Sequence, residues 1–76
     1  MVEVLLFARL RELAGRASVR VRVPAGATPA DLWSALALPG PPPAGLRYAV
    51  GGTWALAGAA LRDGDRVALI TPVSGG

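Results

Sequence analysis

The side chains of this 76-residue sequence offer few groups for catalysis. The sequence contains no Cys and no His, which excludes zinc and iron sites of the Cys/His type and every catalytic triad that uses either residue. All eight basic residues are Arg, so no lysine is available for Schiff-base chemistry. The five carboxylates are scattered along the chain and form no pair that indicates acid–base catalysis. We therefore expect no metal site and no permanently bound cofactor.

Other motifs that resemble binding sites have simpler interpretations. Asp63 and Asp65 flank a glycine, which is typical of a tight turn, whereas a calcium loop would need several more oxygen ligands. The pair Gly51-Gly52 lacks the glycine spacing and the lysine of a phosphate-binding loop and favours a hairpin turn. The two tryptophans could stack on a nucleic-acid base, but core or hairpin packing is the more frequent role of such residues.

The remaining reactive group is the C-terminal carboxylate of Gly76. The sequence ends in Val73, Ser74, Gly75 and Gly76, and glycines without side chains can thread a narrow channel. The last five residues can extend to about 16 Å, enough to reach a buried site in another protein. Adenylation would activate the carboxylate, and a sulfur nucleophile could then convert it to a thiocarboxylate. A frayed tail is the favoured interpretation of Gly-Gly alone, so the case for tail chemistry depends on the fold that precedes it.

Charge and hydropathy point to a protein partner. The net charge is +3, but the arginines are spread over the chain without a dense cluster, which argues against nucleic-acid binding and fits an acidic partner pocket. Hydrophobic residues make up 53% of a chain too small to bury them all, which indicates either an exposed docking patch or simply a high alanine content.

No apolar stretch is long enough to cross a membrane, so we expect a cytoplasmic protein with no membrane contact.

The first half of the sequence predicts two strands and a helix between them. Residues 2–7 form an apolar run typical of a strand buried, or nearly buried, on both faces, and residues 8–14 have helical spacing that ends before Gly15. Strict alternation over residues 18–23 predicts a strand with Val19, Val21 and Val23 on one face. We expect these two strands to pair antiparallel.

The second half predicts the main helix and three further strands. Thr28 is a suitable N-cap with Asp31 three residues later, and the apolar stripe through Ala37 predicts a helix that ends before Pro39. Strands are predicted over residues 47–50, 53–56 and 66–73. With a right-handed crossover, the first and last strands can pair in parallel at the centre of the sheet. This order predicts an α+β fold of the β-grasp (ubiquitin-like) type, with a mixed five-stranded sheet, one main helix and one short helix. The predicted domain spans residues 1–73, and residues 74–76 form a flexible tail.

The sequence as a whole resembles a known protein family. It is similar to the MoaD family of ubiquitin-like sulfur carriers, the small subunits of molybdopterin synthase, over nearly its whole length. The resemblance rests on an FxRxRE-like segment near the start, on the Pro-Val-Ser-Gly-Gly ending, and on the segments 4–15, 27–32, 48–51, 61–68 and 72–76. The sequence departs from the family at Gly51, where Asn is frequent, and at residues 69–71, where aromatic residues and Pro are frequent.

The resemblance implies a function in molybdenum cofactor biosynthesis. An E1-like adenylating enzyme would use ATP to convert the Gly76 carboxylate to an acyl-adenylate, and a sulfur donor would replace AMP to give a thiocarboxylate. Within a heterotetrameric synthase, the large subunit would supply the catalytic residues, and sulfur would pass to cyclic pyranopterin monophosphate. The chain itself would then be a non-catalytic carrier subunit of a sulfurtransferase.

The resemblance also implies which residues contact partners. Gly76 would carry the reacting group, while Val73, Ser74 and Gly75 would thread the partner's channel. Docking would involve an apolar surface and one arginine near it, at the positions Phe7, Leu61, Ile70, Pro72 and Arg11. The residues alone leave open whether Phe7 and Ile70 lie in the core or on the docking surface.

Three other functions share parts of this pattern. Sulfur carriers for thiamine or for tRNA thiolation have the same fold and the same Gly-Gly ending. Ubiquitin-like conjugation to proteins would also use the activated tail. A β-grasp binding module, for RNA for example, would use only the body of the domain, and clustered arginines beside exposed aromatic residues would favour it.

Overall fold

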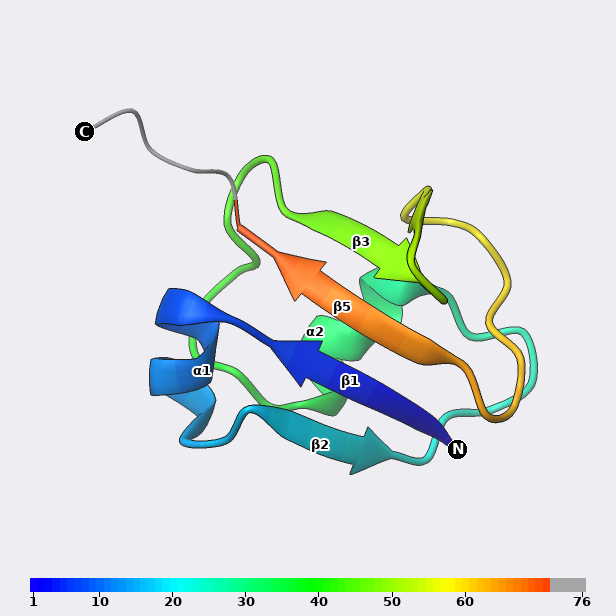
Figure 1. Ribbon diagram of the computed structural model, residues 1–76, viewed down its shortest axis with the longest axis horizontal. Coiled ribbons are helices and arrows are strands. Elements are labelled where there is room, and N and C mark those ends of the chain that lie inside the picture. The colour runs from blue at the N-terminus through cyan, green and yellow to red at the C-terminus, as the bar shows by residue number, and fades with distance from the viewer. Residues whose placement is uncertain (72–76) are drawn as a thin grey trace.

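A five-stranded mixed sheet with helices packed against one face forms the domain (Figure 1). The computed structural model describes residues 1–71. Its elements are β1 (Val2–Leu6), α1 (Ala8–Ala14), β2 (Ser18–Val21), the 3₁₀ helix η1 (Pro29–Asp31), α2 (Leu32–Ala35), β3 (Arg47–Val50), β4 (Thr53–Ala55) and β5 (Arg66–Ile70).

The strands lie in the order β2-β1-β5-β3-β4. β1 and β5 run parallel at the centre, with Val4 opposite Val67, and every other neighbouring pair is antiparallel. The antiparallel pairing of β1 with β2 and the parallel pairing of the first and last strands were both predicted from the order of elements. The β-grasp architecture is therefore confirmed.

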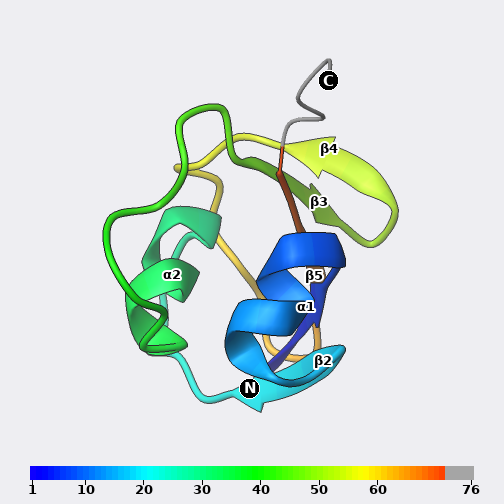
Figure 2. The ribbon, with the colours of Figure 1, turned by 90° about the vertical axis from the view of Figure 1, so that its left-hand side faces the viewer.

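The core lies between the sheet and α2, which crosses behind the strands in Figure 1 and is seen beside the sheet in Figure 2. Alternate residues of the strands point toward it, because successive side chains of a strand lie on opposite faces. The buried cluster contains Val2, Val4, Leu6, Leu10, Val21, Leu32, Trp33, Leu61, Val67 and Leu69. Burying these apolar side chains supplies the main driving force for folding.

The opposite face of the sheet carries no helix among the described residues, and this corrects one prediction. β1 was expected to be buried, or nearly buried, on both faces, yet Glu3 and Leu5 remain half-buried while their neighbours in the strand are fully buried. The apolar run reflects one core face and one apolar but uncovered face. Continuous hydrophobicity in a short strand therefore did not mean burial on both sides.

The main helix begins as predicted but ends early. The Asp31 carboxylate accepts hydrogen bonds from the backbone N–H and the hydroxyl of Thr28, at 2.9 and 3.1 Å, which forms the expected cap. Regular helix ends at Ala35, and Ala37 is exposed with a φ of +54°, so the apolar stripe does not continue to Ala37. Pro39 has no N–H to donate to the Ala35 carbonyl four residues before it, and its ring would clash with that carbonyl in a continued helix, which opposes extension of the helix.

Four strands are shorter than predicted. β1 ends at Leu6 rather than residue 7. β2 ends at Val21 rather than residue 23, and β4 ends at Ala55 rather than residue 56. β5 ends at Ile70, and residues 72 and 73 of its predicted span lie outside the described residues. The hairpin at Gly51 and Gly52 is confirmed, with φ values of +59° and +86° that favour glycine.

A tight turn at residues 62–65 ties the start of β5 to the start of the chain. The Asp65 carboxylate accepts a hydrogen bond from the Arg62 N–H at 2.8 Å, and the Gly64 N–H donates to the Met1 carbonyl at 2.8 Å. The Met1 amino group donates to the Asp63 carboxylate and forms an ion pair with it. This hydrogen bond, aided by the positive charge of the amino group, lowers the pKa of Asp63. The turn interpretation of these two aspartates is confirmed.

The ion pair of Asp63 predicts a pH-dependent contribution to stability. Because its pKa is lower in the folded protein, the contribution is complete above the ordinary pKa of Asp and is lost as the pH falls through the lowered value. Asp63→Asn should therefore lower the melting temperature slightly at neutral pH, and the difference from wild type should vanish in acid. Glu12→Gln, at an exposed position of α1, is the control. A difference that persists at the lowest pH would contradict this prediction.

Candidate functional site

The edge of the sheet where β1 and β5 end is the place from which the C-terminal segment leaves the domain. Because the two central strands are parallel, they end at the same edge, and Leu6 lies opposite Leu69 there. Phe7 follows Leu6 and leads into α1, while Ile70 follows Leu69 and leads to Thr71, the last described residue (Figure 1). We call this the exit edge. It places the predicted docking residues of the first and last strands together.

Phe7 and Ile70 are both surface residues. Phe7 is 51% exposed and occupies the N-cap position of α1 in an extended conformation. Ile70 is partly exposed, and it points away from α2 because its neighbour Leu69 points into the core. Neither belongs to the buried cluster. The structure therefore excludes a core position for both residues, and their role in docking stays a prediction.

Two other predicted contact residues have different environments. Arg11 is exposed on α1, one helical turn after Phe7. Its backbone N–H donates to the Phe7 carbonyl at 3.4 Å. Leu61 is only 9% exposed and belongs to the buried cluster, so its placement on an apolar docking surface is corrected. Its N–H donates to the Ala27 carbonyl at 2.8 Å, which holds the segment before β5 against the domain. Pro72, Val73, Ser74, Gly75 and Gly76 lie outside the described residues.

An apolar row crosses the uncovered face of the sheet beside the exit edge. The register aligns Leu5 of β1, Ala68 of β5, Ala49 of β3 and Trp54 of β4 across the strands. Ile70 lies two residues beyond Ala68 on the same side of β5. We call these five residues the open sheet face. Such a contiguous apolar surface is typical of a site of protein association.

The sequence analysis favoured core or hairpin packing for the two tryptophans, and the structure shows one of each, with Trp54 in the β3–β4 hairpin. Trp33 is indeed in the core, where its ring N–H donates to the Gly40 carbonyl at 2.9 Å. Trp54 is instead 61% exposed, and the Arg47 guanidinium lies 5.7 Å from the centre of its ring. Strand alternation around the Gly51-Gly52 turn could have revealed this, because it places Trp54 opposite Ala49 on the uncovered face.

Charged groups on the same face surround the apolar row. Glu3 accepts a hydrogen bond from the Arg66 guanidinium at 2.8 Å, and Arg20 lies opposite Glu3 on the neighbouring strand. Over residues 1–71 the structure contains no buried charged side chain and no group of three or more acidic residues that could hold a metal ion. It likewise contains no helix long and apolar enough to span a membrane.

Comparisons with known proteins agree with this architecture. The ThiS family model matches residues 4–76 of the chain. The crystal structure of SAMP1 from Haloferax volcanii has a TM-score of 0.82 and 38% identity, covering 99% of this chain and 98% of that one. A second crystal structure, of H. volcanii small archaeal modifier protein 1, has a TM-score of 0.82 and 36% identity, covering 95% and 97%. A protein from Pyrococcus furiosus named as molybdopterin converting factor, subunit 1, has a TM-score of 0.75 and 27% identity, also covering 95% and 97%.

The two faces of β5 should respond differently to substitution. Leu69→Ala leaves a cavity in the core and should lower the free energy of unfolding by about 2–5 kcal/mol. Ile70→Glu, on the uncovered face, should lower it by about 1 kcal/mol or less. Urea unfolding followed by circular dichroism measures both values. If Ile70→Glu is as destabilising as Leu69→Ala, Ile70 belongs to the core and its surface assignment is wrong.

Proposed function

This chain belongs to the ThiS family, and on that premise we propose that it carries sulfur on its C-terminal Gly76 for molybdenum cofactor biosynthesis. The family is one of ubiquitin-like sulfur carriers that work with partner enzymes. The match extends to residue 76, so it includes the Gly-Gly ending on which the chemistry depends. The likeness to the P. furiosus molybdopterin converting factor subunit supports this pathway.

The proposed chemistry takes place on one carboxylate. The Gly76 carboxylate attacks the α-phosphate of ATP on an E1-like enzyme, which forms an acyl-adenylate and releases pyrophosphate. A sulfur donor of the hydrosulfide class then displaces AMP, so that a carbon–sulfur bond forms, the carbon–oxygen bond to AMP breaks, and a thiocarboxylate remains. Sulfur transfer to cyclic pyranopterin monophosphate and hydrolysis return the carboxylate. Partner proteins supply the acid–base groups, because this chain has neither His, Cys nor Lys.

The observation that carries the proposal is the position of the exit edge. β5 is a central strand, so the chain leaves the sheet from its rigid middle, next to exposed Phe7 and the open sheet face. A partner that binds these surfaces would receive the last residues in a defined direction. Five residues beyond Thr71 can span up to about 16 Å, which suits a reaction site inside the partner. The body is then recognised while the tail reacts.

A second candidate is protein modification. The chain is 38% identical to SAMP1 but 27% identical to the molybdopterin converting factor subunit, and the former belongs to the small archaeal modifier proteins by name. Activation of Gly76 would be the same, but an amine of a target protein, rather than a sulfur donor, would displace AMP. The chain contains no Lys and therefore cannot build lysine-linked chains on itself. The remaining alternative, sulfur delivery for thiamine synthesis or tRNA thiolation, would start from the Gly76 thiocarboxylate described for the first candidate.

Removal of Gly76 should abolish activation while leaving the fold intact. Wild type incubated with the E1-like enzyme, ATP and a sulfide source should gain the mass difference between one sulfur and one oxygen atom, as measured by intact-protein mass spectrometry. The chain lacking Gly76 should show no gain. Its melting temperature should equal that of wild type, because the buried cluster of the domain is built from residues 2–69. A mass gain in the truncated chain would refute the assignment of Gly76. A covalent adduct to a second protein would favour the modifier function.

A charge on the exit edge should weaken partner binding more than stability. A docked large subunit should bury more than about 1,000 Å² in total, so Phe7→Glu and Ile70→Glu would place a carboxylate in a desolvated contact. Calorimetric titration with the large subunit of molybdopterin synthase should show a loss of affinity of about tenfold or more. Ala25→Glu, in an exposed turn of the opposite edge, is the matched control. Equal affinity of all three variants would exclude this docking surface.

A further inference from the structure

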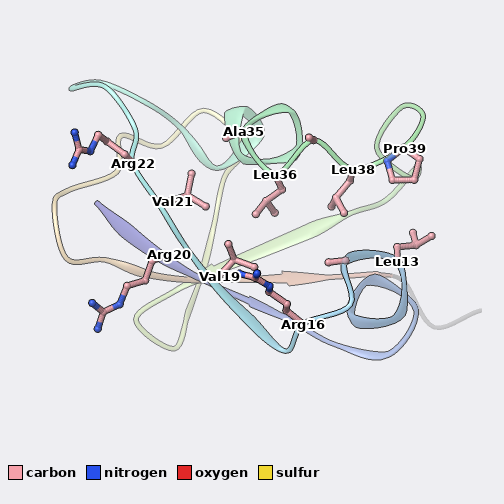
Figure 3. A pocket seen from close by; sticks show the side chains of 12 residues that line it. Leu13, Arg16, Val19, Arg20, Val21, Arg22, Ala35, Leu36, Leu38 and Pro39 are labelled. Atoms are coloured by element: carbon pink, nitrogen blue, oxygen red, sulfur yellow. The ribbon is translucent and has the colours of Figure 1, made fainter.

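A second surface, on the side of the domain away from β4, has the features of a peptide-binding groove. A cavity of about 630 Å³ lies between β2, the end of α1 and the chain that follows α2 (Figure 3). Its apolar wall is formed by Leu13, Val19, Val21, Leu36 and Leu38, and its rim by Arg16, Arg20 and Arg22. We call it the β2 groove. Its apolar wall shares no residue with the exit edge or the open sheet face, and of its rim only Arg20 extends from the side of β2 that continues the open sheet face.

β2 is an edge strand, and the hydrogen-bond pattern shows which of its backbone groups are free. The Leu6 N–H donates to the Ala17 carbonyl at 2.8 Å, so residue 17 points its backbone groups toward β1. In an antiparallel pair this orientation alternates, and Val19 and Val21 therefore also face β1. The N–H and C=O groups of Ser18 and Arg20 point away from the sheet. Among residues 1–71, no strand pairs with this side of β2.

The groove continues the core face of the sheet beyond this free edge. Val19 and Val21 lie on the core side of β2, and Leu36 and Leu38 on the other wall are only partly buried. Leu13 is 49% exposed, although it adjoins the groove. A strand added to β2 would direct every second side chain onto this apolar wall, because side chains alternate between the faces of a sheet. Its backbone would meet the free groups of Ser18 and Arg20.

The charges around the groove select the occupant. Three exposed arginines line the rim, and no acidic residue is among the lining residues. Glu3, which lies opposite Arg20, is already paired with Arg66 at 2.8 Å. A second copy of the chain that paired through β2 would bring two sets of arginines close together, and their like charges would repel one another. An acidic segment would instead neutralise them.

We propose that the β2 groove binds an extended, acidic–aliphatic segment of a partner protein as a sixth strand of the sheet. Main-chain hydrogen bonds to Ser18 and Arg20 provide the pairing, alternate aliphatic side chains fill the apolar wall, and flanking carboxylates meet the arginines. Single-stranded nucleic acid fits less well, because the groove contains no aromatic side chain on which a base could stack. Since the groove is separate from the exit edge, the segment can bind while the tail is engaged elsewhere.

The test uses a synthetic peptide of alternating isoleucine and threonine flanked by aspartates. Bound to the wild-type protein, it should slow amide hydrogen exchange at Ser18 and Arg20 by about tenfold or more, because these N–H groups gain partners. Exchange at Val19 and Val21 should change less, because their N–H groups already face β1. Two control peptides should fail to protect any of them, one with lysines in place of the aspartates and one with N-methylated backbone amides.

Charge-reversed variants give a second measurement. Arg16→Glu and Arg22→Glu should each weaken binding of the aspartate peptide by about tenfold. Arg47→Glu, at an exposed position of β3 that two strands separate from β2, should leave binding unchanged. Three results would overturn the proposal: equal binding of the aspartate and lysine peptides, protection confined to the open sheet face, or tighter binding of a single-stranded RNA oligonucleotide at the same amides. Circular dichroism of each variant verifies that the fold is retained.

Discussion

Backbone hydrogen bonds between β1 and β5 join the two ends of the chain at the centre of the sheet. Val4 lies opposite Val67 and Leu6 opposite Leu69, so residues more than sixty positions apart share one buried face. Closing so long a loop costs conformational entropy, and the buried face offsets that cost. β2 and the β3–β4 hairpin then add to either side of this central pair. The positions of the exit edge, the open sheet face and the β2 groove all follow from this pairing.

Parallel pairing also decides how the reactive end of the chain is presented. Two parallel strands end at the same edge, so the chain passes Thr71 beside Phe7 and the start of α1. Had β5 run antiparallel to β1, the Gly-Gly ending would have left from the opposite edge, away from Phe7. The parallel pairing therefore places the end of β5 beside Phe7 at the exit edge.

A single helical layer leaves two kinds of surface uncovered. On the face away from α2, the apolar row from Leu5 to Trp54 remains accessible, and at the side the edge of β2 is free. Exposed edges favour uncontrolled association, and short strands with charged side chains limit it. β2 has only four residues, and Arg20 lies within it. The same arginines that discourage pairing between copies make the edge selective for an acidic segment.

Local signals in the sequence determined much of this protein. Alternation at Val19 and Val21, the cap formed by Thr28 and Asp31, and the Gly51-Gly52 turn each depend on neighbouring residues and were predicted correctly. Together with the order of elements, they sufficed for the β-grasp architecture. The absence of His, Cys and Lys is equally a property of the sequence, and it directs attention to the C-terminal carboxylate.

Only the tertiary structure decided which apolar residues are buried. The run from Val67 to Ile70 is apolar at every position, so periodicity could not assign Leu69 to the core and Ile70 to the surface. Leu61, expected on a docking surface, fills the core, and Trp54 is exposed. Burial depends on which face α2 covers, and that is fixed by long-range pairing of β1 with β5. A local pattern records the side chains of one segment but contains no information about the layer that a distant segment places over it.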